Sequence, residues 1–219
     1  GDYHCIVIAP STVQEAYDFM YKAFELADMY RNPVIVLGDG ILGQMMEPIE
    51  IKNQKSKIKN YKKPWALTGC KGRKPNVVKS FYIAEGDLEK FNLILQDKYK
   101  LIRGKEQEYE TLFTDDAKII LVAYGTMYRI AKSIVQDLRK KSMRVGLVRP
   151  VKLWPFPDKI FKRLMPKAGY LVLEMSAGQM LDDVRLAVSG KSKVNFLGRS
   201  GGGIPTEEEI TKKIKSLIR

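Results

Sequence analysis

The residues of this sequence best placed to do chemistry are carboxylates that directly follow apolar segments. Asp39 comes after residues 34–37, and Glu174 comes after residues 170–173. If these segments are strands of parallel sheets, both carboxylates lie at a carboxyl edge, where α/β proteins place their ligand sites. Each also has a structural interpretation, because Asp39 can close an Asx turn with Gly40 and Glu174 can serve in a turn or a subunit contact. The sequence leaves these alternatives open.

Other catalytic or metal-binding arrangements are scarce. His4 is the only histidine, and no serine, cysteine or carboxylate is an evident partner for it. Cys5 and Cys70 lie far apart, so neither a disulfide framework nor a zinc or iron–sulfur site can be assembled from this chain alone. Such sparse cysteines favour a reducing cytoplasm. No apolar run approaches the roughly 20 residues that a membrane-spanning helix needs.

The glycine-containing turns do not predict a nucleotide site. A dinucleotide fingerprint places several glycines after the first strand, whereas the turn at Gly125 has a single glycine. The glycines at 201–203 precede a helix that begins with the glutamates 207–209, which would repel a phosphate. The turn Ser176-Ala177-Gly178 precedes another helix, and Asp182 and Asp183 in the first turns of that helix discourage an anion in the same way. We therefore interpret these segments as structural turns.

The net charge of +13 is concentrated in one segment. Between Glu50 and Glu85 there are ten basic residues and no acidic one, and without these ten charges the net charge falls to +3. The run from Lys52 to Lys79, with nearby aromatic residues, makes a nucleic-acid-binding α/β protein the alternative hypothesis. A solvated linker or a subunit contact explains so local a charge more simply. We therefore expect only weak nucleic-acid binding, without sequence preference.

The first fifty residues predict a βαβ unit. Residues 5–9 and 34–37 are continuous apolar runs, typical of strands in a parallel sheet, and a helix capped by Ser11 or Thr12 lies between them. Two strands alone do not make a stable sheet, so this unit looks like the end of a domain with further strands. We expect a break in architecture near Glu50, and strand edges that are exposed or paired with another copy.

The last hundred residues predict a doubly wound α/β domain. Four strands are expected at residues 119–123, 144–148, 170–173 and 193–197, alternating with helices at 127–140, 157–164, 179–188 and from Thr206. Another helix is predicted from Asp87, as its N-cap, to Leu112, with an interruption at Gly104 as the alternative. The predicted organisation is an incomplete first domain (residues 1–50), a basic connector and helix (51–116) and the doubly wound domain (117–219).

Several motifs, taken in their order along the chain, are similar to those of one enzyme family. They are Ala9-Pro10-Ser11-Thr12-Val13-Gln14-Glu15-Ala16, Tyr30-Arg31-Asn32-Pro33-Val34, Leu37-Gly38-Asp39-Gly40, Pro64-Trp65, Ala123-Tyr124-Gly125-Thr126, Val148-Arg149-Pro150, Leu173-Glu174 and Gly202-Gly203-Ile204-Pro205. Together they resemble the α subunit of 2-oxoacid:ferredoxin oxidoreductases, and among these the branched-chain 2-oxoisovalerate type looks closest. The resemblance covers essentially the whole chain.

This resemblance implies a heteromeric thiamine diphosphate enzyme that oxidatively decarboxylates a 2-oxoacid, forms an acyl-coenzyme A and reduces ferredoxin. It implies that residues 1–50 end a thiamine-pyrimidine-type domain and that residues 117–219 form a transketolase C-terminal-like domain. It also implies a β subunit that holds the diphosphate and magnesium, a ferredoxin-like chain with iron–sulfur clusters, and a γ subunit. The family's cofactor-activating glutamate and substrate-contacting threonine and arginine match no position here.

The resemblance makes three strand-end residues candidates for the cofactor cleft or a subunit boundary. These are Ser11 and Thr12, in the loop after the first strand, and Asp39, after the second. We predict no catalytic residue and no metal ligand, and expect this chain to act mainly as scaffold and interface. Alone, it should neither bind thiamine diphosphate tightly nor turn over a 2-oxoacid. A free-standing α/β protein that binds a small molecule is a third possibility.

Overall fold

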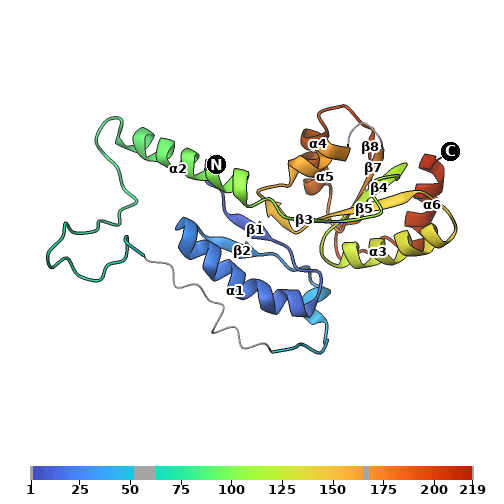
Figure 1. The fold of residues 1–219 in the computed structure, drawn as a ribbon, viewed down its shortest axis with the longest axis horizontal. Coiled ribbons are helices and arrows are strands. Elements are labelled where there is room, and N and C mark those ends of the chain that lie inside the picture. The colour runs from blue at the N-terminus through green and yellow to red at the C-terminus, as the bar shows by residue number, and fades with distance from the viewer. Residues whose placement is uncertain (1, 52–62, 165–167, 219) are drawn as a thin grey trace.

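Two β-sheets organise the chain, which a computed structural model describes at residues 2–51, 63–164 and 168–218 (Figure 1). The smaller sheet has the strand order β2-β1-β6, and the larger sheet has the order β3-β5-β4-β7-β8. Apart from β6, the smaller sheet is built from the first forty residues, and the larger sheet is built from residues after 108. We call the first forty residues, with their helix, the N-terminal unit. The larger sheet and the helices that pack on it are the C-terminal unit.

The N-terminal unit contains the predicted βαβ arrangement. Strands β1 (Ile6–Ile8) and β2 (Val34–Val36) pair in parallel, and α1 (Val13–Tyr30) connects them. Thr12 is the N-cap of α1, and its hydroxyl accepts a hydrogen bond from the Glu15 N–H at 3.0 Å. The capping sequence and the helical repeat of apolar residues were therefore sufficient to place this helix.

The outer edge of β1 is covered, contrary to the prediction of exposed edges. Strand β6 (Lys152–Trp154) pairs antiparallel with β1, with Val7 opposite Trp154. Within the described part of the chain, β2 has β1 as its sole partner strand. The prediction was wrong for β1 because a three-residue strand has no detectable periodicity, and because its partner lies far away in the sequence.

The C-terminal unit contains the four predicted parallel strands with helices on both faces. The strands are β4 (Ile119–Val122), β5 (Val145–Pro150), β7 (Gly169–Glu174) and β8 (Val194–Gly198). Helices α3 (Gly125–Lys140) and α6 (Glu207–Ile218) pack on one face. Helices α4 (Asp158–Leu164) and α5 (Gln179–Val188) pack on the other. The doubly wound prediction is confirmed.

A fifth strand of the larger sheet corrects one helix prediction. Helix α2 (Asp87–Lys105) ends well before Leu112, and β3 (Tyr109–Leu112) pairs antiparallel with β5. The N-cap of α2 is Gly86 rather than Asp87. Tyr109 and Leu112 are three residues apart, a spacing that also fits a helix, so only the tertiary pairing with β5 distinguishes the two structures.

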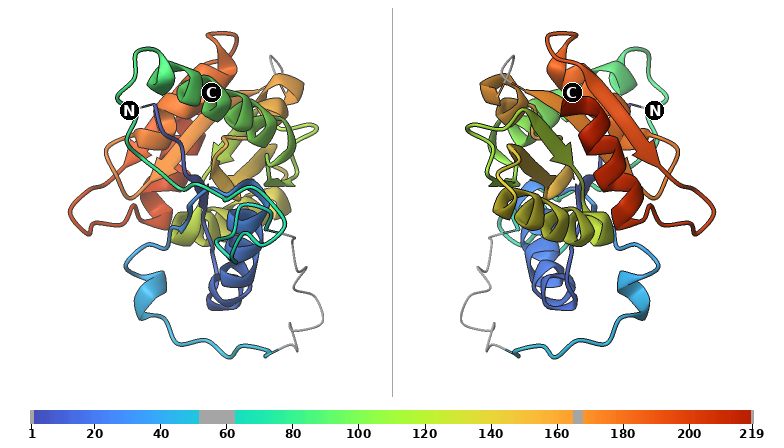
Figure 2. Two further views of the ribbon diagram at one scale, coloured as in Figure 1. Left: turned by 90° about the vertical axis from the view of Figure 1, so that its left-hand side faces the viewer. Right: turned by 90° about the vertical axis from the view of Figure 1, so that its right-hand side faces the viewer.

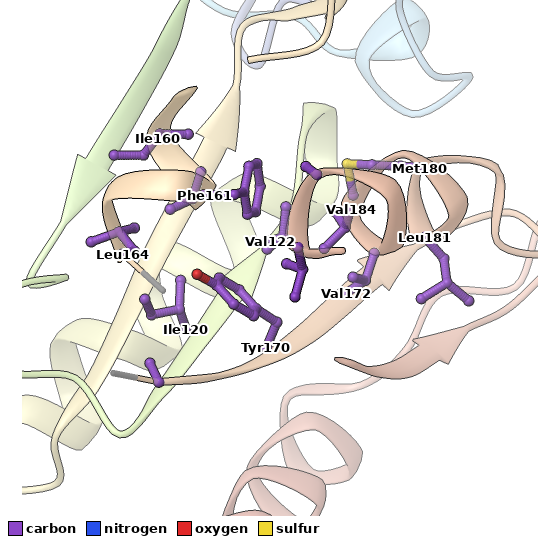
Figure 3. Packing of buried hydrophobic residues seen from close by; sticks show 14 of the residues in the cluster. Ile120, Val122, Ile160, Phe161, Leu164, Tyr170, Val172, Met180, Leu181 and Val184 are labelled. Carbon is purple, nitrogen blue, oxygen red and sulfur yellow. The ribbon is translucent and has the colours of Figure 1, made fainter. Parts of the chain in front are cut away.

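The cores lie between the larger sheet and its two helix layers. On one face, strand side chains such as Ile120, Val122 and Tyr170 pack against Phe161 and Val184 from the helices (Figure 3). Strand β4 is buried along its whole length. Such continuous burial explains why these strands read as unbroken apolar runs in the sequence.

Between the two units, the described residues 45–51 and 63–86 are irregular. After the short 3-10 helix η1 (Leu42–Gln44) the chain runs away from both sheets (Figure 2). It later returns to α1, where Lys63 pairs with Asp28 at 2.7 Å and the Arg31 guanidinium lies 5.1 Å from the centre of the Trp65 ring. Half of the ten basic residues of the predicted connector fall at 52–62, outside the described residues.

Candidate functional site between the two sheets

Asp39 lies after β2 and reaches the first turn of α3 in the other unit. Its carboxylate accepts hydrogen bonds from the Thr126 N–H at 2.7 Å, the Thr126 hydroxyl at 2.7 Å and the Leu42 N–H at 2.9 Å. Burial alone would raise the pKa of Asp39, but these hydrogen bonds outweigh it and hold the pKa below its ordinary value. Asp39 therefore links the carboxyl end of β2 to the positive end of the α3 dipole.

This close approach depends on Gly125, the first residue of α3. Gly125 has a φ of +57°, and a Cβ at this position would lie 2.5 Å from Oδ2 of Asp39. A side chain here would displace the carboxylate and would also strain the backbone. Gly125 does not form part of a nucleotide fingerprint, but it permits the contact between the units.

Ser11 and Thr12 lie between β1 and α1, and their polar groups bind Glu15. The N–H and hydroxyl of buried Ser11 donate to Oε2 of Glu15 at 2.7 and 3.0 Å. Thr12 caps the same helix through its hydroxyl. Both residues also line an open groove of about 380 Å³ between the two units, together with residues of α3 such as Lys132.

Glu15 in turn makes the second link between the units. Arg149 of β5 is 1% exposed and binds Glu15 with both terminal nitrogens, Nη1 to Oε1 at 2.8 Å and Nη2 to Oε2 at 2.5 Å. Arg149 also donates to the Ala9 carbonyl at 3.1 Å and to Glu110 at 3.2 Å. Burial would raise the pKa of Glu15, but hydrogen bonds from Arg149 and Ser11 outweigh it and lower the pKa.

Tyr128 of α3 completes the Arg149 cluster. Its hydroxyl donates to Glu110 at 2.8 Å, and its ring centre lies 4.8 Å from the Arg149 guanidinium, within cation–π range. Burial and the hydrogen bond to Glu110 raise the pKa of Tyr128 to about 12. The phenol therefore stays protonated at neutral pH and serves as a hydrogen-bond donor.

A third polar cluster joins α1 to the segments before β3 and at β6. Lys152 is 3% exposed and binds Glu106 at 2.6 Å, and Glu106 also accepts a hydrogen bond from the Tyr30 hydroxyl at 2.5 Å. Lys22 of α1 binds Glu108 at 2.5 Å. Each of these contacts connects residues that are far apart in the sequence, so no local sequence pattern indicates them.

Glu174, at the carboxyl end of β7, caps α5. Its buried carboxylate accepts hydrogen bonds from the Met180 and Leu181 N–H groups at 3.2 and 2.8 Å and from the Ser176 hydroxyl at 2.6 Å. The geometry therefore supports a structural role for Glu174, at the turn between β7 and α5. A cavity of about 90 Å³ remains beside it, lined by Asp39, Tyr124, Met127, Leu173, Glu174 and Met175.

The described strand ends do not fit a bound magnesium–diphosphate group or an iron–sulfur cluster. Among the described residues no group of three or more His, Cys, Asp or Glu side chains could hold a metal ion. The strand-end carboxylates are engaged within the chain, since Asp39 binds Thr126, and Glu174 accepts hydrogen bonds from the Met180 and Leu181 N–H groups. Cys5 and Cys70 are both free thiols.

Sequence reasoning missed the partners of the predicted site residues, above all Arg149 and Glu15. One signal was available, because Arg149 is a charged residue in an otherwise apolar strand, and a charge buried in a strand requires a partner. The sequence could not name Glu15 as that partner. It also gave no reason to place Thr126 beside Asp39.

Two family models match the chain and together cover most of it. The model described as pyruvate flavodoxin/ferredoxin oxidoreductase, thiamine diphosphate-binding, matches residues 1–120, which is more than half of the chain. The chain belongs to this family. The model described as pyruvate:ferredoxin oxidoreductase core domain II matches residues 117–210.

Curated relatives are oxidoreductase subunits, and the chain spans only part of their length. It is 41% identical over 218 residues to the ketoisovalerate oxidoreductase subunit VorB of Methanothermobacter thermautotrophicus, covering 99% of this chain and 61% of that protein. It is 32% identical over 244 residues to the 2-oxoglutarate synthase subunit KorA of Methanothermobacter marburgensis, covering 99% of this chain and 65% of that protein. The nucleic-acid-binding alternative finds no support in these relatives.

Solved structures show the same fold at low sequence identity. A 2-oxoglutarate:ferredoxin oxidoreductase from Magnetococcus marinus aligns with a TM-score of 0.75 at 19% identity, covering 100% of this chain and 43% of that one. A split-gene transketolase aligns with a TM-score of 0.53 at 12% identity, covering 98% of this chain and 57% of that one. The predicted transketolase-like α/β fold is confirmed. In addition, no helix in the described part of the chain has the length and apolar character needed to cross a bilayer.

Proposed function

We propose that this chain is part of the α subunit of a 2-oxoacid:ferredoxin oxidoreductase that acts on a branched-chain 2-oxoacid such as 2-oxoisovalerate. The observation that carries this proposal is the 41% identity over 218 residues to a ketoisovalerate oxidoreductase subunit, against 32% to a 2-oxoglutarate synthase subunit. In the proposed reaction a 2-oxoacid and coenzyme A give an acyl-coenzyme A and carbon dioxide, and two electrons pass to ferredoxin.

The proposed role of this part of the subunit is to position the ends of β1 and β2. Ser11 and Thr12 hold the first strand end through Glu15, and Asp39 holds the second through Thr126. These three residues remain our candidates for lining the cofactor cleft or a subunit boundary. In this proposal, residues 1–50 end the thiamine-pyrimidine-type domain, 51–116 form the connector and helix, and 117–219 form the transketolase-like domain.

The remaining parts of the active complex are proposed to lie on other chains. The described residues hold no set of side chains suited to magnesium or to a cluster. We therefore assign magnesium and the diphosphate of thiamine diphosphate to a β subunit, and the iron–sulfur clusters to a ferredoxin-like chain, in a complex that also has a γ subunit. The proposed setting is the cytoplasm.

The test compares the isolated chain with the complete complex. Acyl-coenzyme A formation from 2-oxoisovalerate and from 2-oxoglutarate is measured with a viologen acceptor, and thiamine diphosphate binding with magnesium is measured by calorimetry. We expect the complete complex to prefer 2-oxoisovalerate and the isolated chain to show neither turnover nor tight binding. A complete complex that is inactive with every 2-oxoacid would contradict the function. Turnover by the isolated chain would contradict the scaffold role.

The basic connector provides a separate check on the alternative function. We expect the chain to bind oligonucleotides weakly, with an affinity that falls steeply as salt is raised, because a local cluster of lysines acts mainly by releasing counterions. Fluorescence anisotropy at several salt concentrations measures this. Submicromolar binding to one defined sequence at physiological salt would instead support a nucleic-acid-binding role.

A further inference from the structure

The C-terminal sheet has a topological switch point between β4 and β7. The chain leaves β4 through α3 toward β5, and it leaves β7 through α5 toward β8 on the other side. Because α3 and α5 pack on opposite faces, a crevice opens outside the carboxyl ends of these two strands. Doubly wound domains commonly bind their ligands in such a crevice.

In this chain the crevice is filled by a residue of the N-terminal unit. Asp39 accepts the Thr126 N–H and hydroxyl hydrogen bonds at the first turn of α3, where an anionic ligand would otherwise receive them. The space that remains is about 90 Å³, far below the roughly 300 Å³ of a small-molecule pocket. Glu174 lines the same space, so a second anion would meet two carboxylates.

We propose that the switch-point crevice of the C-terminal unit is an intrachain docking site whose occupant is the Asp39 carboxylate. Asp39 is then the positioning residue that fixes the orientation of the N-terminal unit against the C-terminal unit. Gly125 is the matching feature on the other side, because only a residue without a Cβ lets Oδ2 of Asp39 approach so closely. This inference concerns the geometry of one chain and does not depend on the proposed function.

The orientation is measured between spin labels on the two units. Labels are placed at Phe24 in α1 and Leu186 in α5, both of which are largely exposed, after replacement of Cys5 and Cys70. We expect one narrow distance distribution in the parent chain and a broader or shifted one in Asp39→Ala. Asp28→Ala is the matched control, because Asp28 pairs with Lys63 and makes no link to α3.

Two outcomes would overturn the proposal. One is an Asp39→Ala variant that is folded by circular dichroism and keeps the parent distance distribution. The other is a distribution that broadens in Arg149→Ala but not in Asp39→Ala, which would assign the orientation to the Glu15–Arg149 pair instead. If Asp39→Ala does not fold, Asp39→Asn answers the question. The N–H groups of Thr126 and Leu42 donate to different oxygens of Asp39, and asparagine replaces one of these oxygens with an NH2 donor, so one of the two hydrogen bonds is lost and the distribution should still broaden.

A double-mutant cycle tests the contact itself. Gly125→Ala should lower the unfolding midpoint more in the parent than in Asp39→Ala, where the Cβ no longer meets Oδ2 and only the positive φ is strained. Gly190→Ala is the control, since Gly190 has a φ of +72° and no heavy atom within 4 Å of a Cβ there. It should lower the midpoint equally in both backgrounds. Equal losses from Gly125→Ala in both backgrounds would contradict the docking contact.

Discussion

The two units of this chain are stabilised by different interactions. The C-terminal sheet has fifteen buried residues in the cluster on each face, and β4 is buried throughout. The buried cluster around the N-terminal unit has seven residues, of which two, Tyr99 and Ile102, come from α2. The unit also leaves Phe24 of α1 70% exposed and Ile35 of β2 44% exposed. The larger unit thus depends mainly on buried apolar area, whereas the smaller unit has much less of it.

The smaller unit is placed by polar links to the larger one. Glu15 binds Arg149, Asp39 binds Thr126, and Lys22 binds Glu108, and each pair joins distant parts of the chain. Such links differ from apolar packing because they are directional and depend on charge. Shape and volume therefore specify the C-terminal core, whereas a few particular side chains, together with the pairing of β6 with β1, specify the geometry between the units.

The largest effect should come from a cavity in the C-terminal core. Phe161 is fully buried between α4 and the sheet, so Phe161→Ala should lower the free energy of unfolding by about 3–5 kcal/mol. The matched change Phe24→Ala, on the exposed side of α1, should change it by no more than about 0.5 kcal/mol. Urea unfolding measures both. Equal losses would break the contrast between the units.

Removing Arg149 should have the next largest effect. Arg149→Ala leaves Glu15 without its main partner in a partly buried position, and loss of one member of a buried ion pair costs about 3 kcal/mol. Arg149→Lys should recover only part of the loss, because lysine keeps the positive charge but its ammonium group cannot make the two-point contact. The free energy of unfolding is again measured in urea. An Arg149→Ala variant as stable as the parent would show that this pair does not stabilise the boundary.

Acid should weaken the boundary between the units before it weakens the C-terminal sheet. The folded pKa values of Glu15 and Asp39 lie below their ordinary values of 4.5 and 3.8. Their contribution is therefore complete above about pH 4.5 and is lost as the pH falls through the folded pKa values. Burial, together with the nearby carboxylates of Asp182 and Glu174, raises the pKa of Asp183 in α5. Protonation of Asp183 therefore stabilises the C-terminal unit as the pH falls.

Spin-label distances and circular dichroism between pH 7 and pH 3 separate the two events. We expect the distance distribution to broaden at a pH where the secondary structure is still present. Asp39→Asn should reduce the pH dependence of that broadening, because this side chain does not titrate. Simultaneous loss of both signals would show that the two units unfold as one.

The smallest effects should come from the helix caps, which are present in both units. Thr12 caps α1 and Thr206 caps α6, with hydroxyl-to-N–H distances of 3.0 and 3.2 Å. Thr12→Ala and Thr206→Ala should each lower the free energy of unfolding by about 1 kcal/mol, and the serine variants should retain most of it. A much larger loss for Thr12→Ala than for Thr206→Ala would show that Thr12 also contributes to the boundary with the C-terminal unit.

Local physical signals in the sequence are sufficient to place several helices and strands. Continuous apolar runs identified β4 and β7, and the Thr-x-x-Glu pattern placed the starts of α1 and α6 within one turn. The alternation of strands and helices gave the doubly wound class of the C-terminal unit. The sequence also identified Ser11, Thr12 and Asp39 as strand-end residues, because a strand-end position depends only on where each apolar run stops.

Which side chains meet depends on the tertiary structure. Strand β3 was predicted as helix, and β6 was not predicted, because each forms through pairing with a strand that is distant in the sequence. In the same way, Asp39 was known to end a strand, but only the packing of the two units brings it to Thr126. Periodicity and capping report on neighbours along the chain, whereas the contacts between the units join distant residues, such as Glu15 and Arg149, which are 134 positions apart.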